Sequence, residues 1–347
     1  MSQIINLSFS SHQILHILLL GFASFVISMI ITPIYTKFAY DHEWWKRLRN
    51  DSWSGGEATV YKQLHAEKHK RHIPTMAGLI FITSITLITL FANLDRSQTW
   101  LPLAAMVGSG FIGLVDDIIN IRGSNKSLAG MKSKLKFLLH SFVALIGGWW
   151  FFAKLGVTTI YIPGFNHVHI GVFVIILFWF VVVATANAVN ISDGLDGLAG
   201  GLLSSSFGAY SIICVFEGKY ALAGFCLTVV GALLSYTWFN IFPARFFMGD
   251  VGAFGLGTAL GVIAMLTDTI YILPVIGIVY FTETLSVIIN RTSKKLRKGK
   301  KVFLSSPIHH HFEAIGWPET KITMRFWIIG QIGGVLGIVF FLLRGSL

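Results

Sequence analysis

The chain has 347 residues, of which 54% are hydrophobic and only 12% are charged, and its mean hydropathy is +0.69. Ordinary soluble domains carry about 25% charged residues, so the composition excludes a soluble globular enzyme and indicates an integral membrane protein. The net charge of +11 is spread over short loops between apolar segments. That distribution argues against nucleic-acid binding and favours anionic substrates or lipid headgroups as partners.

Ten apolar segments are long enough, with short and glycine-broken ones allowed, to cross a hydrocarbon core of about 30 Å. They run over about residues 14–34, 74–93, 100–115, a fourth ending near 154, 170–186, a sixth from 198, 220–239, 251–266, 270–290 and 323–343. They leave no room for a large soluble domain. The sequence therefore predicts an all-α integral membrane protein with one polytopic domain over residues 1–347.

Two further features concern the outer face. Residues 156–169 alternate Val, Ile and Tyr around Pro163-Gly164, which predicts a small external β-hairpin. When the ten segments are threaded through a membrane, 22 of the 27 Lys and Arg residues fall on one side and 4 on the other. The positive-inside rule then predicts that both termini lie outside. The first 13 residues lack Lys and Arg and precede a long apolar run, so we expect a retained first span.

The cysteines, Cys214 and Cys226, both lie inside apolar segments, so the sequence indicates neither a disulfide framework nor a thiolate metal site.

The stretch from Asn187 to Gly201, NAVNISDGLDGLAGG, places polar and glycine residues between apolar segments. Asp193 and Asp196 are three residues apart, so on a helical turn they would share a face. A carboxylate at membrane depth costs about 3 kcal/mol, which favours a functional site. The alternative is a solvated loop between two spans.

Two more carboxylate motifs lie at span ends on the same predicted side. In GFIGLVDDIIN, the side chains of Asp116 and Asp117 would point about 100° apart on a helix, so they should have different tasks. In FFMGDVG, Asp250 stands between glycines at the mouth of a span, where it could hold Mg²⁺ beside a phosphate. The alternatives are a solvated carboxylate pair and a helix N-cap.

Histidines and cations complete this face. His309, His310 and His311 stand in series before Glu313. Consecutive side chains point in different directions, which disfavours a zinc site and favours hydrogen bonds to phosphate or sugar, with a plain surface run as the alternative. Lys68, Lys70 and Arg71 precede Pro74-Thr75 at the second span, where they contact a substrate or only set topology. Together these motifs predict metal-assisted transfer of a phosphate-bearing group at a cytoplasm-facing site.

Five motifs covering nearly the whole chain resemble the polyprenyl-phosphate hexose-1-phosphate transferases. They are PTMAGL from Pro74, GLVDDI from Gly113, NAVNISDGLDGLAGG from Asn187, FFMGDVG from Phe246 and SPIHHHFEAIGW from Ser306. The last motif, with Arg325-Phe326-Trp327, resembles the branch whose donor is UDP-N-acetylmuramoyl-pentapeptide. A sister transferase using UDP-N-acetylglucosamine and a polyprenyl-phosphate or ion-coupled transporter are the alternative functions.

The resemblance implies a ten-span fold in the bacterial inner (cytoplasmic) membrane, a homodimer and a Mg²⁺ cofactor. It implies attack by undecaprenyl phosphate on the UDP-linked donor, which gives lipid I and UMP in the first membrane step of peptidoglycan synthesis. Catalytic roles would fall to Asp116, Asp117, Asp250 and His309, and metal binding to Asp250, Asp116 and Asn190. Substrate contacts would come from Lys70, Thr75, Asn187, Asn190, Asp193, Asp196, Phe247, His309, His310 and His311.

Three positions depart from the pattern of this family. Asn120 stands where a lysine commonly follows the aspartate pair, His72 and Ile73 replace a Gly-Thr pair, and Ala77 replaces a glycine. Arg122 or Lys126 would have to supply the cation missing at position 120. Direct attack with Asp116 as proton acceptor and a two-step route through a covalent aspartate both remain open.

Overall fold

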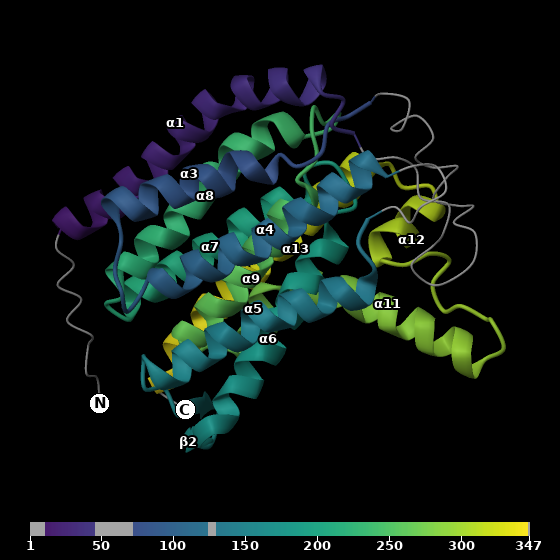
Figure 1. Cartoon of the computed structure of the whole chain (residues 1–347). Helices are drawn as coiled ribbons and strands as arrows, with labels where there is room; N and C mark the ends of the chain where they lie inside the picture. The colour runs from purple at the N-terminus through teal and green to yellow at the C-terminus, as the bar shows by residue number, and fades with distance from the viewer. Residues whose placement is uncertain (1–10, 46–71, 124–129, 346–347) are drawn as a thin grey trace.

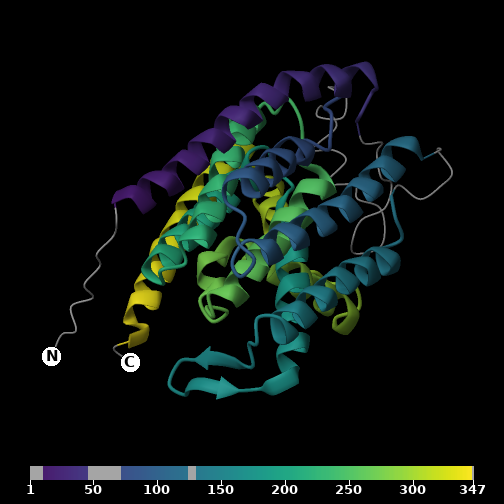
Figure 2. The ribbon, with the colours of Figure 1, turned by 60° about the vertical axis from the view of Figure 1, so that its left-hand side comes forward.

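The computed structural model describes residues 11–45, 72–123 and 130–345. Eight of the helices in these ranges are long and apolar enough to cross a membrane. They are α1 (Ser11–Asp41), α4 (Trp100–Arg122), α5 (Ser133–Ala153), α6 (Val174–Ser192, extended to Gly171 by the 3₁₀ turn η1, Gly171–Phe173), α7 (Leu198–Phe216), α8 (Tyr220–Asn240), α9 (Gly249–Leu266) and α13 (Glu319–Leu342). The chain is therefore a multi-pass membrane protein, and most of its helices run side by side in one bundle (Figures 1 and 2).

Two of the expected spans look different in the structure. The second is α3 (Gly78–Ala92), whose 15 residues are fewer than a perpendicular span needs. The ninth is broken at Gly277 into a short α10 (Leu273–Ile276) and a longer α11 (Ile278–Leu296). Glycine is a poor helix former, which suits a break at this point. Beyond the break, α11 leaves the bundle and leads to α12 (Ile308–Ala314) (Figure 1).

Helix α9 forms the centre of the bundle. In its most apolar window 89% of the residues are buried, against 28% for α1 and α13. Glycines allow neighbouring helices to approach its first turn closely: a methyl group on Gly113 of α4 would lie 2.3 Å from the Asp250 carbonyl oxygen. Small residues at such crossings are typical of helix packing in membranes. This packing fixes the position of Asp250.

The predicted hairpin is confirmed as a two-stranded antiparallel sheet of β1 (Thr159–Ile162) and β2 (Asn166–His169). It is tied to the helices through Asp268, which accepts a hydrogen bond from the Tyr161 amide at 2.8 Å. Asp268 also pairs with Arg344, which lies in the final 3₁₀ turn η2 (Leu343–Gly345), at 2.8 Å. The hairpin, the α9–α10 connection and the C-terminal turn therefore meet at one end of the bundle.

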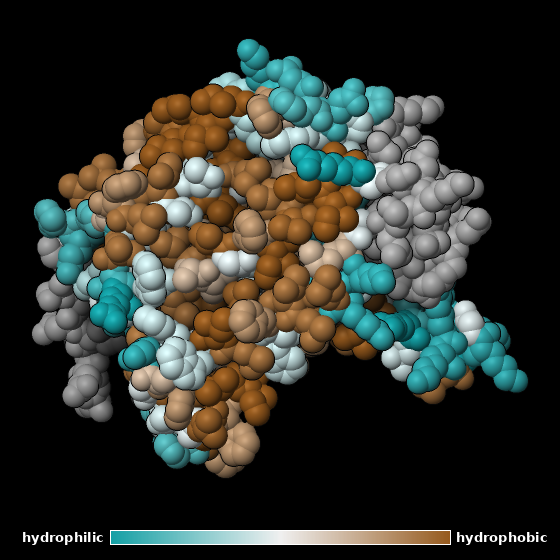
Figure 3. Space-filling view, viewed as in Figure 1, coloured by the Kyte–Doolittle hydropathy of each residue, from teal (hydrophilic) through white to brown (hydrophobic). Residues whose placement is uncertain are grey.

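The outer surface of the helices is apolar. Large side chains such as Phe22, Phe111 and Trp238 are each more than 60% exposed. In the space-filling view, hydrophobic residues cover the middle of the visible face and hydrophilic ones gather toward its margins (Figure 3). Exposed apolar area on this scale indicates contact with lipid.

Candidate active site

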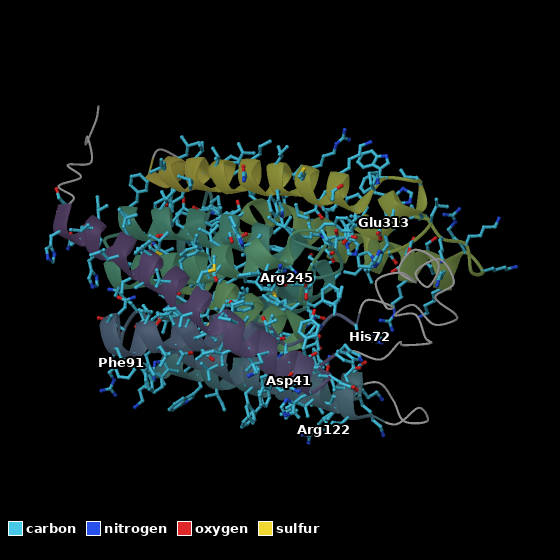
Figure 4. All side chains as sticks on the ribbon, turned by 90° about the horizontal axis from the view of Figure 1, so that it is seen from above. Asp41, His72, Phe91, Arg122, Arg245 and Glu313 are labelled. Carbon is cyan, nitrogen blue, oxygen red and sulfur yellow. The ribbon has the colours of Figure 1, made fainter. Side chains whose placement is uncertain are left out.

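His72, Arg122 and Glu313, which lie in or next to the PTMAGL, GLVDDI and SPIHHHFEAIGW motifs, are found toward one end of the bundle, and Phe91 lies toward the opposite end (Figure 4). Further polar motifs meet there. Main-chain hydrogen bonds join two of these motifs directly. The Phe247 amide donates to the Pro74 carbonyl at 2.8 Å, and the Ala77 amide donates to the Phe247 carbonyl at 3.0 Å. The PTMAGL and FFMGDVG segments are therefore one unit of structure.

A lysine bridges two carboxylates of this end. Lys136 Nζ lies 2.5 Å from Asp116 Oδ2 and 2.6 Å from Asp250 Oδ2. The side-chain amide of Asn190 donates to Asp250 Oδ1 at 3.3 Å. Because these residues come from α4, α5, α6 and α9, the cluster forms only when four helices pack together. Nothing in the sequence distinguishes Lys136 from the other cations between the third and fourth apolar segments, which are Arg122, Lys126, Lys132 and Lys134.

Asp117 has different partners from its neighbour, as expected from the angle between adjacent helical side chains. It is fully buried, and its Oδ2 atom accepts the Val251 amide at 3.2 Å. A methyl group on Gly249 would lie 2.5 Å from the same oxygen. Asp117 therefore holds the start of α9. Asp250 itself lies in the first turn of α9 without capping it, and the aspartate pair lies within α4, which continues to Arg122.

The 187–201 stretch is divided between the end of α6, a turn and the start of α7. Asp193 and Asp196 lie in that turn, so the prediction of a shared helical face is wrong. Gly197 has a φ of +77°, a left-handed conformation that favours glycine. Asp196 is buried and its Oδ2 accepts the Ala244 amide at 3.0 Å, whereas Asp193 is only half-buried. Asp193 is therefore the carboxylate of the turn that a ligand reaches more easily.

One face of α13 holds the main chain of the same turn. Glu319 Oε1 accepts the Asp196 amide at 2.6 Å, and the Thr323 hydroxyl donates to the Asp196 carbonyl at 3.2 Å. The Trp327 indole donates to the Gly197 carbonyl at 3.1 Å. These residues recur every four positions, so they share a helical face. None of the three was expected as a site residue.

The three histidines of α12 face three different partners. His309 is fully buried with Nδ1 at 2.9 Å from Glu283 Oε1, and His310 Nδ1 lies 2.6 Å from Glu313 Oε2. His311 Nδ1 accepts the Leu304 amide at 3.3 Å. In the described ranges no three or more His, Cys, Asp or Glu side chains are grouped so that they could hold a metal ion.

The remaining expected residues differ in accessibility. Asn187 is exposed, Phe247 and Asn190 are half-buried, and Thr75 is buried. Lys70 and Lys126 lie outside the described residues. Arg122 is exposed at the end of α4, whereas Lys136 places its ammonium group between Asp116 and Asp250. Lys136 therefore supplies a cation near the aspartate pair, where position 120 carries asparagine.

The donor set fits a magnesium ion. Mg²⁺ is commonly held by one or two carboxylates, with water and substrate phosphates completing its shell. Asp116 and Asp250 converge on one positive charge, the Lys136 ammonium, and Asn190 adds an amide group beside them. The two carboxylates therefore form a place where a cation is stabilised.

Comparison with known proteins identifies the relatives of this chain. Residues 99–268 match the model of the Glycosyl transferase family 4. The phospho-N-acetylmuramoyl-pentapeptide-transferase of Chloroflexus aggregans is 36% identical over 342 residues, which cover 95% of this chain and 90% of the relative. That of Geobacillus sp. (strain WCH70) is 36% identical over 322 residues, covering 91% and 94%. With this identity over nearly its whole length, the chain belongs to the phospho-N-acetylmuramoyl-pentapeptide-transferase family.

Proposed function

We propose that this protein transfers phospho-N-acetylmuramoyl-pentapeptide from its UDP-linked donor to undecaprenyl phosphate, giving lipid I and UMP. The observation that carries the proposal is the Asp116–Lys136–Asp250 cluster at one end of a membrane bundle, in a chain of this family. Two carboxylates and a cation beside lipid-facing helices suit a reaction between a diphosphate and a lipid phosphate.

In the proposed reaction an oxygen of the lipid phosphate attacks the sugar-linked phosphorus of the donor. A new diphosphate bond forms, the bond from that phosphorus to the UMP oxygen breaks, and UMP leaves with the electron pair. Lys136 offsets phosphate charge, and Asp116 accepts the proton when the lipid phosphate arrives protonated. Mg²⁺ bound by Asp250, Asp116 and Asn190 would supply further compensation of the diphosphate charge.

Several half-buried and exposed residues of the motifs are proposed to bind the donor. They are Asn187, Asp193, Phe247 and His310, with Lys70 joining them from outside the described residues. The buried Asp117, Asp196 and His309 would act through the main chain and neighbouring side chains. We also propose that this face is cytoplasmic in the bacterial inner membrane, because most Lys and Arg residues belong to its loops.

The test is UMP release by the purified protein. We expect UMP only when UDP-N-acetylmuramoyl-pentapeptide, undecaprenyl phosphate and Mg²⁺ are all present. Chelation of Mg²⁺ should stop the reaction, and UDP-N-acetylglucosamine should not replace the donor. Failure to release UMP in a Mg²⁺-dependent way with either sugar would contradict the proposal. Rapid-quench trapping of a phosphorylated or glycosylated enzyme would replace direct attack by the two-step route.

A further inference from the structure

Glu283 and His309 form a fully buried polar pair outside the carboxylate cluster. Both side chains are 0% exposed, and His309 Nδ1 lies 2.9 Å from Glu283 Oε1. The second oxygen of the carboxylate, Oε2, lies 3.5 Å from the main-chain nitrogen of His309. Glu283 belongs to α11 and His309 to α12, so the pair joins the helix that leaves the bundle to the histidine segment. Burying a carboxylate is costly, and a fold retains one where it has a partner.

The other ring nitrogen of His309 faces the aspartate-containing turn. A methyl group on Gly194 would lie 2.3 Å from Nε2 and 2.8 Å from Cε1 of His309. The imidazole is therefore fixed on one side by a carboxylate and on the other by the main chain between Asp193 and Asp196. Only glycine at position 194 leaves room for a ring held in this way.

His309 also supports its neighbour. The rings of His309 and His310 meet edge to face, with centroids 4.1 Å apart. His310 is mostly buried and pairs with Glu313, and it is one of the proposed donor contacts. The orientation of the His309 ring thus affects two donor-binding elements, the turn at Gly194 and the His310 side chain.

We infer that Glu283 is a positioning residue for donor binding: it sets the orientation of His309, which in turn holds the Asp193–Gly197 turn and His310 in place. A carboxylate 2.9 Å from one nitrogen of a fully buried imidazole attracts that edge of the ring and limits how the ring can turn. The inference rests on the proposed function, because it assigns the turn and His310 to the UDP-linked donor. Glu283 does not itself touch the substrate.

The test compares Glu283→Gln and Glu283→Leu with the native protein. Glutamine keeps an oxygen for the ring, whereas leucine has a similar volume and none. We expect the donor KM to rise about threefold for Glu283→Gln and about tenfold for Glu283→Leu, while kcat and the undecaprenyl phosphate KM change little. Glu217→Gln, which alters a carboxylate paired with Lys219 outside this region, is the matched control and should keep the native donor KM.

A double-mutant cycle with Gly194→Ala gives a second readout. The added methyl meets a ring that Glu283 holds in place, so Gly194→Ala alone should raise the donor KM strongly. In the Glu283→Leu background the His309 ring can turn, so Gly194→Ala should raise the donor KM less than it does in the native background. If the two substitutions change the free energy of donor binding additively, the inference is overturned. It is also overturned if the donor KM rises only in variants that lose thermal stability. If the glutamate variants do not fold, a native donor KM in Gly194→Ala would overturn it.

The outcome is separable from the proposed function. Native protein that releases no UMP contradicts the proposed function. Native protein that releases UMP while Glu283→Leu folds and keeps the native donor KM contradicts only the role of Glu283.

Discussion

At the scale of single residues, the site depends on how three charges are arranged. Asp116 and Asp250 would repel each other without the Lys136 ammonium between them, at 2.5 and 2.6 Å. Asp117, next in sequence, is removed from this set because its Oδ2 holds the Val251 amide. Adjacent carboxylates thus divide into one that pairs with Lys136 and one that supports the helix carrying Asp250.

Replacement of the central aspartate tests the metal assignment. Asp250→Asn keeps the shape of the side chain and removes its charge, so we expect turnover to fall roughly 100-fold or more while the thermal unfolding temperature is retained. UMP release and unfolding temperature are measured on the same preparation. Asp268→Asn, at the hairpin end, is the control and should remain active. Near-native turnover in Asp250→Asn would remove Asp250 from the metal site.

The lysine can be tested with a matched cation. Lys136→Gln removes the charge that lies between two carboxylates, and we expect UMP release to fall roughly 100-fold because phosphate charge is left uncompensated. Lys154→Gln alters an exposed lysine whose ammonium lies 5.9 Å from the Trp149 ring centroid, and it should have no effect. Equal rates for the two variants would contradict the role given to Lys136.

At the scale of elements, glycine contacts between helices set the position of the carboxylates. Gly113 of α4 and Gly78 of α3 would each place a methyl group within 2.4 Å of the α9 main chain. We expect Gly113→Ala to push α9 away from α4, lowering stability by about 1–3 kcal/mol and reducing kcat. Gly208→Ala in α7 is the control, since nothing lies within 4 Å of the added methyl. Thermal unfolding and UMP release on both variants check this.

The connections between helices give a prediction on pH. Burial raises the pKa of Glu217 despite the opposing charge of Lys219. Protonated Glu217 therefore favours the folded state at pH values below the pKa that this side chain has in the unfolded chain. That contribution is lost as pH rises through the pKa that it has in the folded protein. Glu217→Gln imitates the protonated form, so it should unfold at a higher temperature than native protein at pH 7 and at an equal temperature near pH 4.

Asp95 is a control, because its pKa is shifted in the opposite direction to that of Glu217. A hydrogen bond from the Ser97 hydroxyl lowers its pKa, so its contribution is present at neutral pH and lost on acidification. Asp95→Asn should therefore lower the unfolding temperature at pH 7 and have no effect in acid. Unfolding scans from pH 2 to 7 check both variants, because the contribution of Asp95 is lost only as pH falls below 3.8. Equal signs of the change in unfolding temperature for the two variants at pH 7 would contradict the assignments.

At the scale of the whole molecule, the two ends of the bundle differ. One end carries the carboxylate cluster and the histidine segment, and the other carries the hairpin and the Asp268–Arg344 pair. The apolar side chains between them place both ends at membrane surfaces. The ten spans and external termini that the sequence predicts would make the hairpin external and the end of α11 cytoplasmic.

Labelling of single cysteines tests this orientation. Cys214 and Cys226 are fully buried, so the native protein should react little. Phe165→Cys in the hairpin turn and Leu296→Cys at the end of α11 would introduce thiols at positions that are 76% and 75% exposed. A membrane-impermeant maleimide should label Phe165→Cys in right-side-out vesicles and Leu296→Cys only in inverted ones. The reverse result would contradict the predicted topology.

The sequence alone determined the class of the protein, its hairpin and its family, because these depend on local patterns. Long apolar runs can satisfy their main-chain hydrogen bonds in lipid only as helices or closed barrels, and alternating residues around Pro163-Gly164 favour a hairpin. The motifs around Asp116, Asp193, Asp250 and His309 are likewise local, so the chemistry they carry could be expected before their positions were known.

Only the tertiary structure decided which of these residues meet and which are buried. In the sequence Lys136 resembles the neighbouring cations, because its partner Asp250 is 114 residues away. Glu283 is an isolated acid in an apolar segment, and its partner His309 is 26 residues away. Asp196 and His309 proved to be buried supports, and the break at Gly277 divided an expected span. Packing between distant helices controls each of these outcomes, and no local pattern encodes it.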